Sequence, residues 1–355
     1  MEVRSVFAVA VIIAAAVMFI PASDADISDT EIFTYYELLE ENDAAVYKEV
    51  AKATSVDAGT KDFEVAFKDM RLFSDIDRAK DYGDSTVQQA LAAVYLSCPM
   101  VPYIWDYPVK KVEVTPSIST VKITTADGKE STSYVVDSVS FSLTVPEGIT
   151  ADSIKEINSV IDSVKVTGNT DADKVLSIMS YLNGLSFLKD EEGEVSNIYD
   201  ALVVKKTTSA GVSQAFSQLC MLNNIPVITV TGYNLLAAEE TFSCWNYVYL
   251  EGDVDGTTKM SWYIVDPSYT NSTGIAGYLT EVVYENKAYS MSSAHYTDLT
   301  LSSPNTLTVP PLEKNSYVPV GGIPFWQKYG EMFIIMAIAV LVILALLHAA
   351  KTGNI

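Results

Sequence analysis

The hydrophobic pattern of the chain begins with a continuous apolar stretch. It runs from Val6 to Ile20, follows the basic residue Arg4 and precedes a small-residue pattern that ends at Ala25. A basic start, a short apolar run and small residues after it are typical of a secretory signal peptide. We therefore expect a signal peptide at residues 1–25, with an uncleaved N-terminal anchor as the alternative.

A second continuous apolar stretch lies near the other end, from Met332 to Ala350. At about 1.5 Å per residue, a helix of this length would span the hydrocarbon layer of a membrane. The sequence therefore predicts a transmembrane helix at 331–350 and a cytoplasmic tail at 351–355. Several prolines lie between residues 302 and 330, and we expect an extended stalk there.

The residues that flank the two apolar stretches predict an orientation. Arg4 precedes the first stretch and Lys351 follows the second. Because basic residues favour the cytoplasmic side, we expect a single-pass protein of the cell membrane with its ectodomain outside the cell.

Between these ends the pattern predicts a mixed α+β body. Residues 27–95 are expected to be mostly helical, whereas apolar and polar residues alternate from Lys110 to Val145 around a turn at Ala126–Lys129. That alternation predicts a β-hairpin. We expect an N-terminal helical and hairpin region at 26–168, followed by a core at 169–301.

The core is expected to pair a buried helix with an antiparallel sheet. Apolar residues recur at helical spacing after Ser209, whose hydroxyl can act as an N-cap, and the helix should end at Asn223-Asn224. Three strand-like runs follow, at Val227–Thr231, Trp245–Leu250 and Trp262–Val265. One helix covering an antiparallel sheet is an α+β layer.

Charge and cysteine content restrict the classes of function. The 355 residues carry a formal net charge of −22, which opposes nucleic-acid binding because a phosphate-binding surface needs excess Lys and Arg. Cys98, Cys220 and Cys244 form no CxxC pair, so we expect neither a metal nor a cofactor. A disulfide between two of these cysteines and glycosylation at the Asn271 sequon stay open.

Three short motifs carry the candidate chemistry. Ser209 is followed by Gly211, by Ala215-Phe216 and by a helix exit at Ile225-Pro226. The second and third motifs are Ser243-Cys244-Trp245-Asn246 and Trp262-Tyr263-Ile264-Val265-Asp266-Pro267. In order and spacing they resemble the motifs of transglutaminase-like (papain-like thiol) domains, in which a Cys opens a helix, a His-x-Trp-Asn strand follows, and an Asp-Pro pair ends the next strand.

The resemblance implies that Ser209, Ser243 and Asp266 occupy the positions of a catalytic triad. In that family a thiolate at a helix N-terminus is the nucleophile, an imidazole is the base, and a carboxylate orients the imidazole. Here serines stand at the Cys and His positions, and only the Asp is retained. Because a serine hydroxyl needs a base to take its proton, we expect the three residues to be catalytically inactive.

Other residues offer only partial substitutes for the missing groups. Ser213 gives an alternative alignment of the nucleophile, and Cys244 lies one position after the base site, but neither supplies an imidazole. His295 follows the sheet and is expected to be structural. For catalysis, Tyr247, Tyr263 or His295 would have to be recruited as a base, or Asp266 would have to act directly or through water.

Three functions follow as hypotheses. We favour a surface-anchored, transglutaminase-like protein without catalysis, which binds peptides or cell-envelope polymers or organises the cell surface. The second hypothesis is an acyltransferase or peptidase that uses Ser209. The third is a purely structural acidic surface module with no ligand.

Overall fold

The computed structural model describes residues 32–107, 112–124, 129–187, 196–235, 242–268, 281–284, 287–290, 295–299, 307–314 and 317–320. The predicted signal peptide, transmembrane helix and cytoplasmic tail lie outside these ranges. Within them, no helix combines the length and the apolar character needed to cross a membrane.

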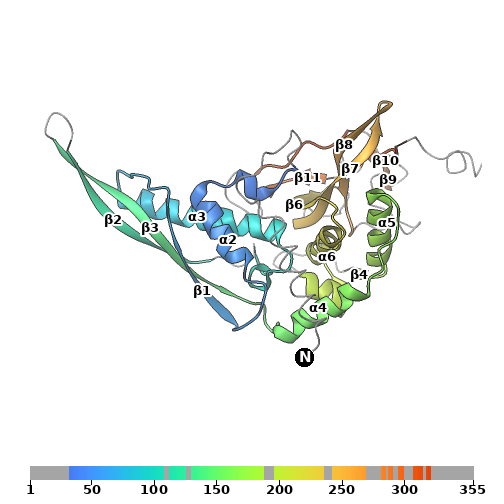
Figure 1. Ribbon diagram of the computed structural model, residues 1–355, viewed down its shortest axis with the longest axis horizontal. Helices are drawn as coiled ribbons and strands as arrows, with labels where there is room; N and C mark the ends of the chain where they lie inside the picture. Colours follow the sequence, from blue (N-terminus) through green and yellow to red (C-terminus); the bar gives the residue numbers. More distant parts are fainter. Residues whose placement is uncertain are drawn as a thin grey trace, which may run out of the picture. The chain divides into compact units, whose positions relative to one another are not determined.

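The helices fall into two groups along the chain (Figure 1). The first group contains η1 (Tyr35–Leu38), α2 (Glu41–Ala51), α3 (Ile76–Ser97) and η2 (Pro102–Ile104). The second contains α4 (Ala151–Ser163), α5 (Asp171–Leu182), the π-helical turn η3 (Asp200–Val204) and α6 (Ser209–Leu222).

The strands form two larger sheets. Antiparallel β1 (Thr60–Ala66), β3 (Glu130–Thr144) and β2 (Val114–Thr124) lie in that order. The second sheet has the order β11 (His295–Thr297), β6 (Val227–Asn234), β7 (Phe242–Val254) and β8 (Thr257–Val265). Two short pairs complete the described strands, namely parallel β4 (Ser186–Phe187) with β5 (Lys206–Thr207) and antiparallel β9 (Glu281–Tyr284) with β10 (Lys287–Ser290). The predicted α+β class is confirmed.

The first sheet shows why its strands form. Along β1, Phe63 and Val65 are buried while Asp62 and Glu64 are exposed, as the two-residue period of a half-buried strand requires. Phe63 faces Phe141 of β3 in the register, and their rings stack with centroids 5.2 Å apart. Helix α3 contacts β2 and β3.

The sequence did not predict β1, because residues 27–95 were expected to be mostly helical. That expectation is wrong over Thr60–Ala66. Only a short alternation of apolar and polar residues marks this segment in the sequence. Its strand conformation depends on hydrogen bonds to β3, which lies more than 60 residues later in the chain. The hairpin predicted over Lys110–Val145 is present as β2 and β3, although its turn at residues 125–128 lies outside the described ranges.

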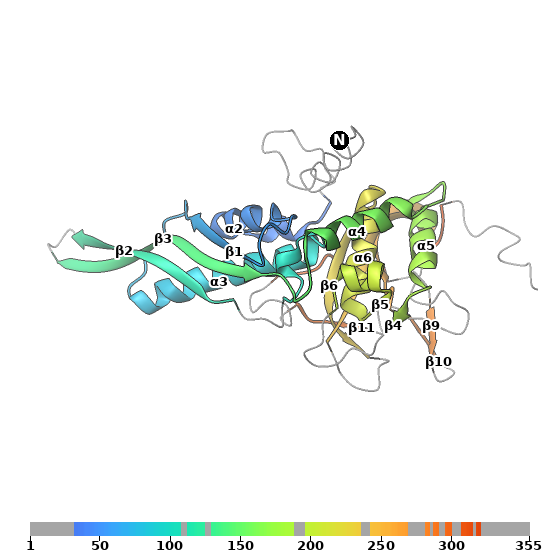
Figure 2. The same cartoon turned by 90° about the horizontal axis from the view of Figure 1, so that it is seen from below.

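Helix α6 is the buried helix predicted for the core. All of its residues from Ser209 to Cys220 are buried, as expected for a helix packed on every side. It contacts β6, α5 and η3, and Figure 2 shows it among α4, α5 and β6. The helix ends at Asn223 as predicted, and Asn224 adopts a left-handed conformation with φ of 57°, which asparagine tolerates better than most residues.

Residues 307–314, part of the predicted stalk, run along the second sheet. Leu307 is buried, Leu312 bridges to Trp262, and the backbone N–H of Glu313 donates to the Trp262 carbonyl at 2.8 Å. This segment therefore packs against β8.

A small second unit contains Glu251–Met260 and, within the described ranges, residues 317–320. Its hairpin turns at Asp255 and Gly256, which both have positive φ. The Asp253 amide donates to the Val318 carbonyl at 2.8 Å, and the Tyr317 hydroxyl donates to the Glu251 carbonyl at 3.0 Å.

Candidate functional site

The start of α6 is fixed by a set of buried hydroxyl groups. Ser196 Oγ accepts from the Thr208 amide at 2.8 Å and lies within hydrogen-bond distance of both Thr207 Oγ1 and Thr208 Oγ1. Thr208 is the N-cap residue and Ser209 is the first residue of the helix. The expected capping role of Ser209 is therefore wrong, because the helix begins one residue earlier than that role requires.

Gly211 allows this packing. A Cβ atom at this position would lie 2.6 Å from both Asn197 O and Ser196 Oγ and closer still to Thr207 Oγ1. The chain around α6 therefore has no room for a side chain here.

We expect Gly211→Ala to lower the free energy of unfolding by roughly 2 kcal/mol, because overpacking forces the backbone apart. Urea denaturation followed by circular dichroism measures the change. Gly59→Ala is the matched control, since nothing lies within 4 Å of a Cβ at Gly59. Equal stability of the two variants would contradict the steric explanation.

Ser209 is held against strand β7. Its side chain is 2% exposed, and its Oγ accepts a hydrogen bond from the Cys244 backbone N–H at 2.9 Å. Ser243, the preceding residue on β7, is 4% exposed and faces Gly232 of β6 in the register. Ser209 thus contacts the residue that follows Ser243, and both serines are buried.

Asp266 follows the last residue of β8, the neighbour of β7 in the sheet, and is 0% exposed. Its Oδ1 accepts from the Ser268 amide at 2.9 Å and from the Ser268 hydroxyl at 2.6 Å. An Asp that accepts from the backbone two residues later stabilises a turn. The carboxylate is thus engaged in shaping the strand end.

A buried polar cluster between α6 and the strands β6 and β7 was not recognised from the sequence. Asn246 of β7 donates through Nδ2 to Ser217 Oγ at 2.9 Å, Ser213 O at 3.2 Å and Thr229 Oγ1 at 3.3 Å. Ser217 Oγ and Thr229 Oγ1 are 2.9 Å apart. The cluster ties α6 to β6 and β7, and the spacing of Ser213 and Ser217 on a buried helix was the signal that could have revealed it.

The alternative nucleophile Ser213 is also buried, at 0% exposure. Its carbonyl accepts from Asn246, and within the described part of the chain its hydroxyl has no hydrogen-bond partner. Exchanging Ser209 for Ser213 in the alignment therefore gives no access to a substrate.

Two of the candidate substitute bases, Tyr247 and Tyr263, are buried. Burial raises the pKa of Tyr247, whose hydroxyl pairs with Thr297 Oγ1 at 3.0 Å. His295 begins β11 and faces Asn234 in the register, so strand β6 separates it from β7.

Cys98, Cys220 and Cys244 form no disulfide with one another in the structure. Burial raises the pKa of the Cys98 thiol to about 11 and that of the Cys220 thiol well above its usual value. Cys244 Sγ is buried at 4.0 Å from the Tyr95 hydroxyl. High thiol pKa values disfavour the thiolate, which is the reactive form. Over the described ranges, no three His, Cys, Asp or Glu side chains gather as a metal site.

Comparison with known proteins gives structural likeness only. No family model matches the chain, and no curated protein matches it. A candidate cysteine protease from Cytophaga hutchinsonii aligns at 17% identity and a TM-score of 0.25, covering 44% of this chain and 64% of that one. A TGase aligns at 14% identity and a TM-score of 0.26, covering 59% and 51% respectively. The chain resembles transglutaminase-like proteins.

A further transglutaminase-like neighbour is the periplasmic domain of TgpA from Pseudomonas aeruginosa. It aligns at 12% identity and a TM-score of 0.20, covering 46% of this chain and 66% of that one. The chain spans 41% to 66% of the length of four solved structures that it matches. With TM-scores this low, the likeness assigns no chemistry to individual residues.

Proposed function

We propose that the protein is a surface-anchored, transglutaminase-like protein that performs no catalysis and binds peptides or cell-envelope polymers. The observation that carries this proposal is the burial of Ser209, which is 2% exposed and whose Oγ accepts from the Cys244 amide. A nucleophile must reach its substrate, and this hydroxyl is enclosed between α6 and β7.

The chemistry around Ser209 supports the same conclusion. A serine becomes a nucleophile when an adjacent base removes its proton. The base position holds Ser243, a second hydroxyl, and the Asp266 carboxylate accepts two hydrogen bonds from Ser268. The base position therefore supplies a hydroxyl in place of an imidazole, and Oδ1 of the remaining carboxylate already accepts two hydrogen bonds.

The proposed surface location rests on the two apolar stretches of the sequence. A signal peptide and a C-terminal transmembrane helix would place the acidic body outside the cell. A strongly acidic surface stays soluble and attracts cationic partners, which favours binding over a ligand-free structural module.

We expect no covalent labelling of Ser209 by a fluorophosphonate, a broad serine-acylating probe, in the full chain. Mass spectrometry of the intact protein and its peptides measures the label, with trypsin as a positive control for the probe. Label on Ser209 that Ser209→Ala removes, while circular dichroism shows the variant folded, would support the acyltransferase or peptidase hypothesis instead.

A further inference from the structure

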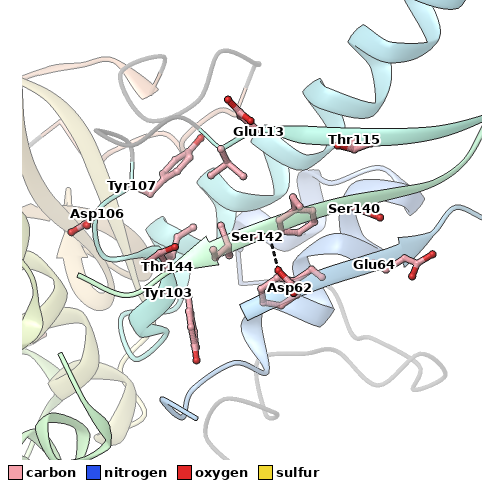
Figure 3. A pocket seen from close by; sticks show the side chains of 15 residues that line it. Asp62, Glu64, Tyr103, Asp106, Tyr107, Glu113, Thr115, Ser140, Ser142 and Thr144 are labelled. Atoms are coloured by element: carbon pink, nitrogen blue, oxygen red, sulfur yellow. Dashed lines mark hydrogen bonds between the residues drawn. The ribbon is translucent and has the colours of Figure 1, made fainter. Parts of the chain in front are cut away.

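A cavity of about 800 Å³ lies at the sheet β1–β3–β2, away from Ser209, Ser243 and Asp266. Residues of β1, β2, β3 and η2 line it (Figure 3). This volume is in the range of pockets that hold small molecules or a few residues of a peptide. No catalytic motif of the sequence contributes to it.

The lining of the cavity is acidic. Asp62 and Glu64 come from β1, Asp106 follows η2, and Glu113 precedes β2. The described lining contains four carboxylates and no Lys or Arg. Because these side chains come from three separate segments, the fold gathers negative charge that the sequence leaves dispersed.

One of these carboxylates, Asp106, acts on a neighbouring residue. Burial raises the pKa of Asp200, a hydrogen bond from the Asn197 backbone lowers it, and the negative charge of Asp106 raises it. A hollow lined by charges of one sign concentrates ions of the opposite sign. A ligand that fits this cavity is therefore cationic.

The aromatic residues of the lining already hold an ammonium group. Lys61 Nζ lies 6.0 Å from the ring centroid of Phe63 and 5.9 Å from that of Tyr103. Both rings belong to the cavity lining. A lysine cation over an aromatic face is stabilised by the quadrupole of the ring. Along β1, Lys61 and Phe63 lie on the face opposite to Asp62 and Glu64, so this ammonium group lies on the other side of the strand from those two carboxylates.

Hydroxyl groups complete the polar surface of the cavity. Thr115, Ser140, Ser142 and Thr144 line it, and Ser142 Oγ donates to Asp62 Oδ1 at 2.5 Å. A hydroxyl can both donate to and accept from a peptide group. This surface therefore suits a peptide backbone better than an aliphatic polyamine, which carries no amides.

We propose that the cavity binds a lysine-bearing peptide segment, with ammonium groups at the carboxylates and backbone amides at the hydroxyls. The inference rests on the proposed binding function and names its site and ligand class. It places the binding surface at the sheet β1–β3–β2 and not at Ser209, Ser243 and Asp266.

Isothermal titration of the full chain with trilysine peptide tests the proposal, in detergent because of the two predicted apolar segments. We expect saturable binding that weakens as salt screens the charges. Glu64→Gln combined with Glu113→Gln should raise the Kd at least tenfold, because both side chains line the cavity and both are exposed.

The matched control is Glu130→Gln combined with Asp81→Asn. It removes two exposed carboxylates that lie outside the cavity lining, and the Kd should change less than twofold. A peptide of the same length with acetylated lysines should not bind. Equal weakening in both double variants would overturn the proposal, because it would indicate unspecific attraction to an acidic surface.

Two further outcomes are decisive. Binding of spermidine without binding of trilysine would overturn the peptide assignment in favour of a free polyamine. Absence of binding by both probes would overturn the cavity as a cation site. Neither result depends on whether Ser209 is labelled. The proposal of a cation-binding cavity and the proposal that Ser209 is not catalytic are therefore tested independently.

Discussion

Replacing Asn246 by aspartate is expected to destabilise the protein by about 3–5 kcal/mol at pH 8, because a carboxylate would be buried without a cation. Asn246 is 0% exposed, and its Nδ2 donates to Ser217, Ser213 and Thr229. A carboxylate loses these donors and faces the Ser213 carbonyl oxygen, which repels it.

The effect of Asn246→Asp should depend on pH. Burial raises the pKa of a carboxyl group, so the new side chain becomes neutral in the folded protein as the pH falls and can then donate one hydrogen bond. We expect the loss of unfolding free energy to be smaller at pH 5 than at pH 8. Guanidinium denaturation at both values measures it.

Asn224→Asp is the control for this substitution. Asn224 is exposed and left-handed, a conformation that aspartate also adopts. The free energy of unfolding of the Asn224→Asp variant should differ from that of wild type by less than about 0.5 kcal/mol, as for most surface substitutions. A similarly small change for Asn246→Asp would show that the cluster does not hold α6 on the sheet.

Asp43 is expected to make the protein less stable as the pH rises. This residue of α2 is 6% exposed, and its pKa is raised from 3.8 to about 6. Burial is the largest cause and the charge of Glu40 adds to it, while hydrogen bonds from Glu40 and Thr86 and the charge of Arg71 act in the opposite direction.

The sign follows from the difference between the folded and unfolded states. The folded protein holds the proton of Asp43 more tightly than the unfolded chain does, so its stabilising contribution is complete below pH 4. It is lost as the pH rises through about 6, and at 1.36 kcal/mol per pKa unit the loss reaches at most about 3 kcal/mol.

Asp43→Asn should therefore remove this part of the pH dependence and raise the unfolding free energy at pH 8 relative to wild type. Denaturation curves from pH 4 to pH 8 measure it. The control is Asp81→Asn, which changes an exposed carboxyl group on α3. Parallel pH profiles for wild type and Asp43→Asn would contradict the assignment.

The sequence predicted those elements whose signals are local. The end of α6 at Asn223 and the strands around Trp245 and Trp262 were expected, because hydrophobic periodicity and turn residues mark them directly.

The contacts that define the site could not be predicted in this way. The partner of Ser209 is the amide of Cys244, which lies 35 residues away in sequence, and motif spacing does not show which atom a hydroxyl contacts. The acidic cavity was missed for a similar reason. Its carboxylates extend from Asp62 to Glu113 along the chain, and only the fold brings them to one surface.

The hydrogen bond between Ser209 and the Cys244 amide also bears on how such a site can change in evolution. A cysteine at position 209 would offer sulfur, a weak acceptor, so the amide would lose its hydroxyl partner at a cost of about 1–3 kcal/mol. No base would yet exist at position 243 to activate the thiol. A stepwise change to a thiol enzyme would therefore pass through a less stable and still inactive protein, which favours retention of the serine.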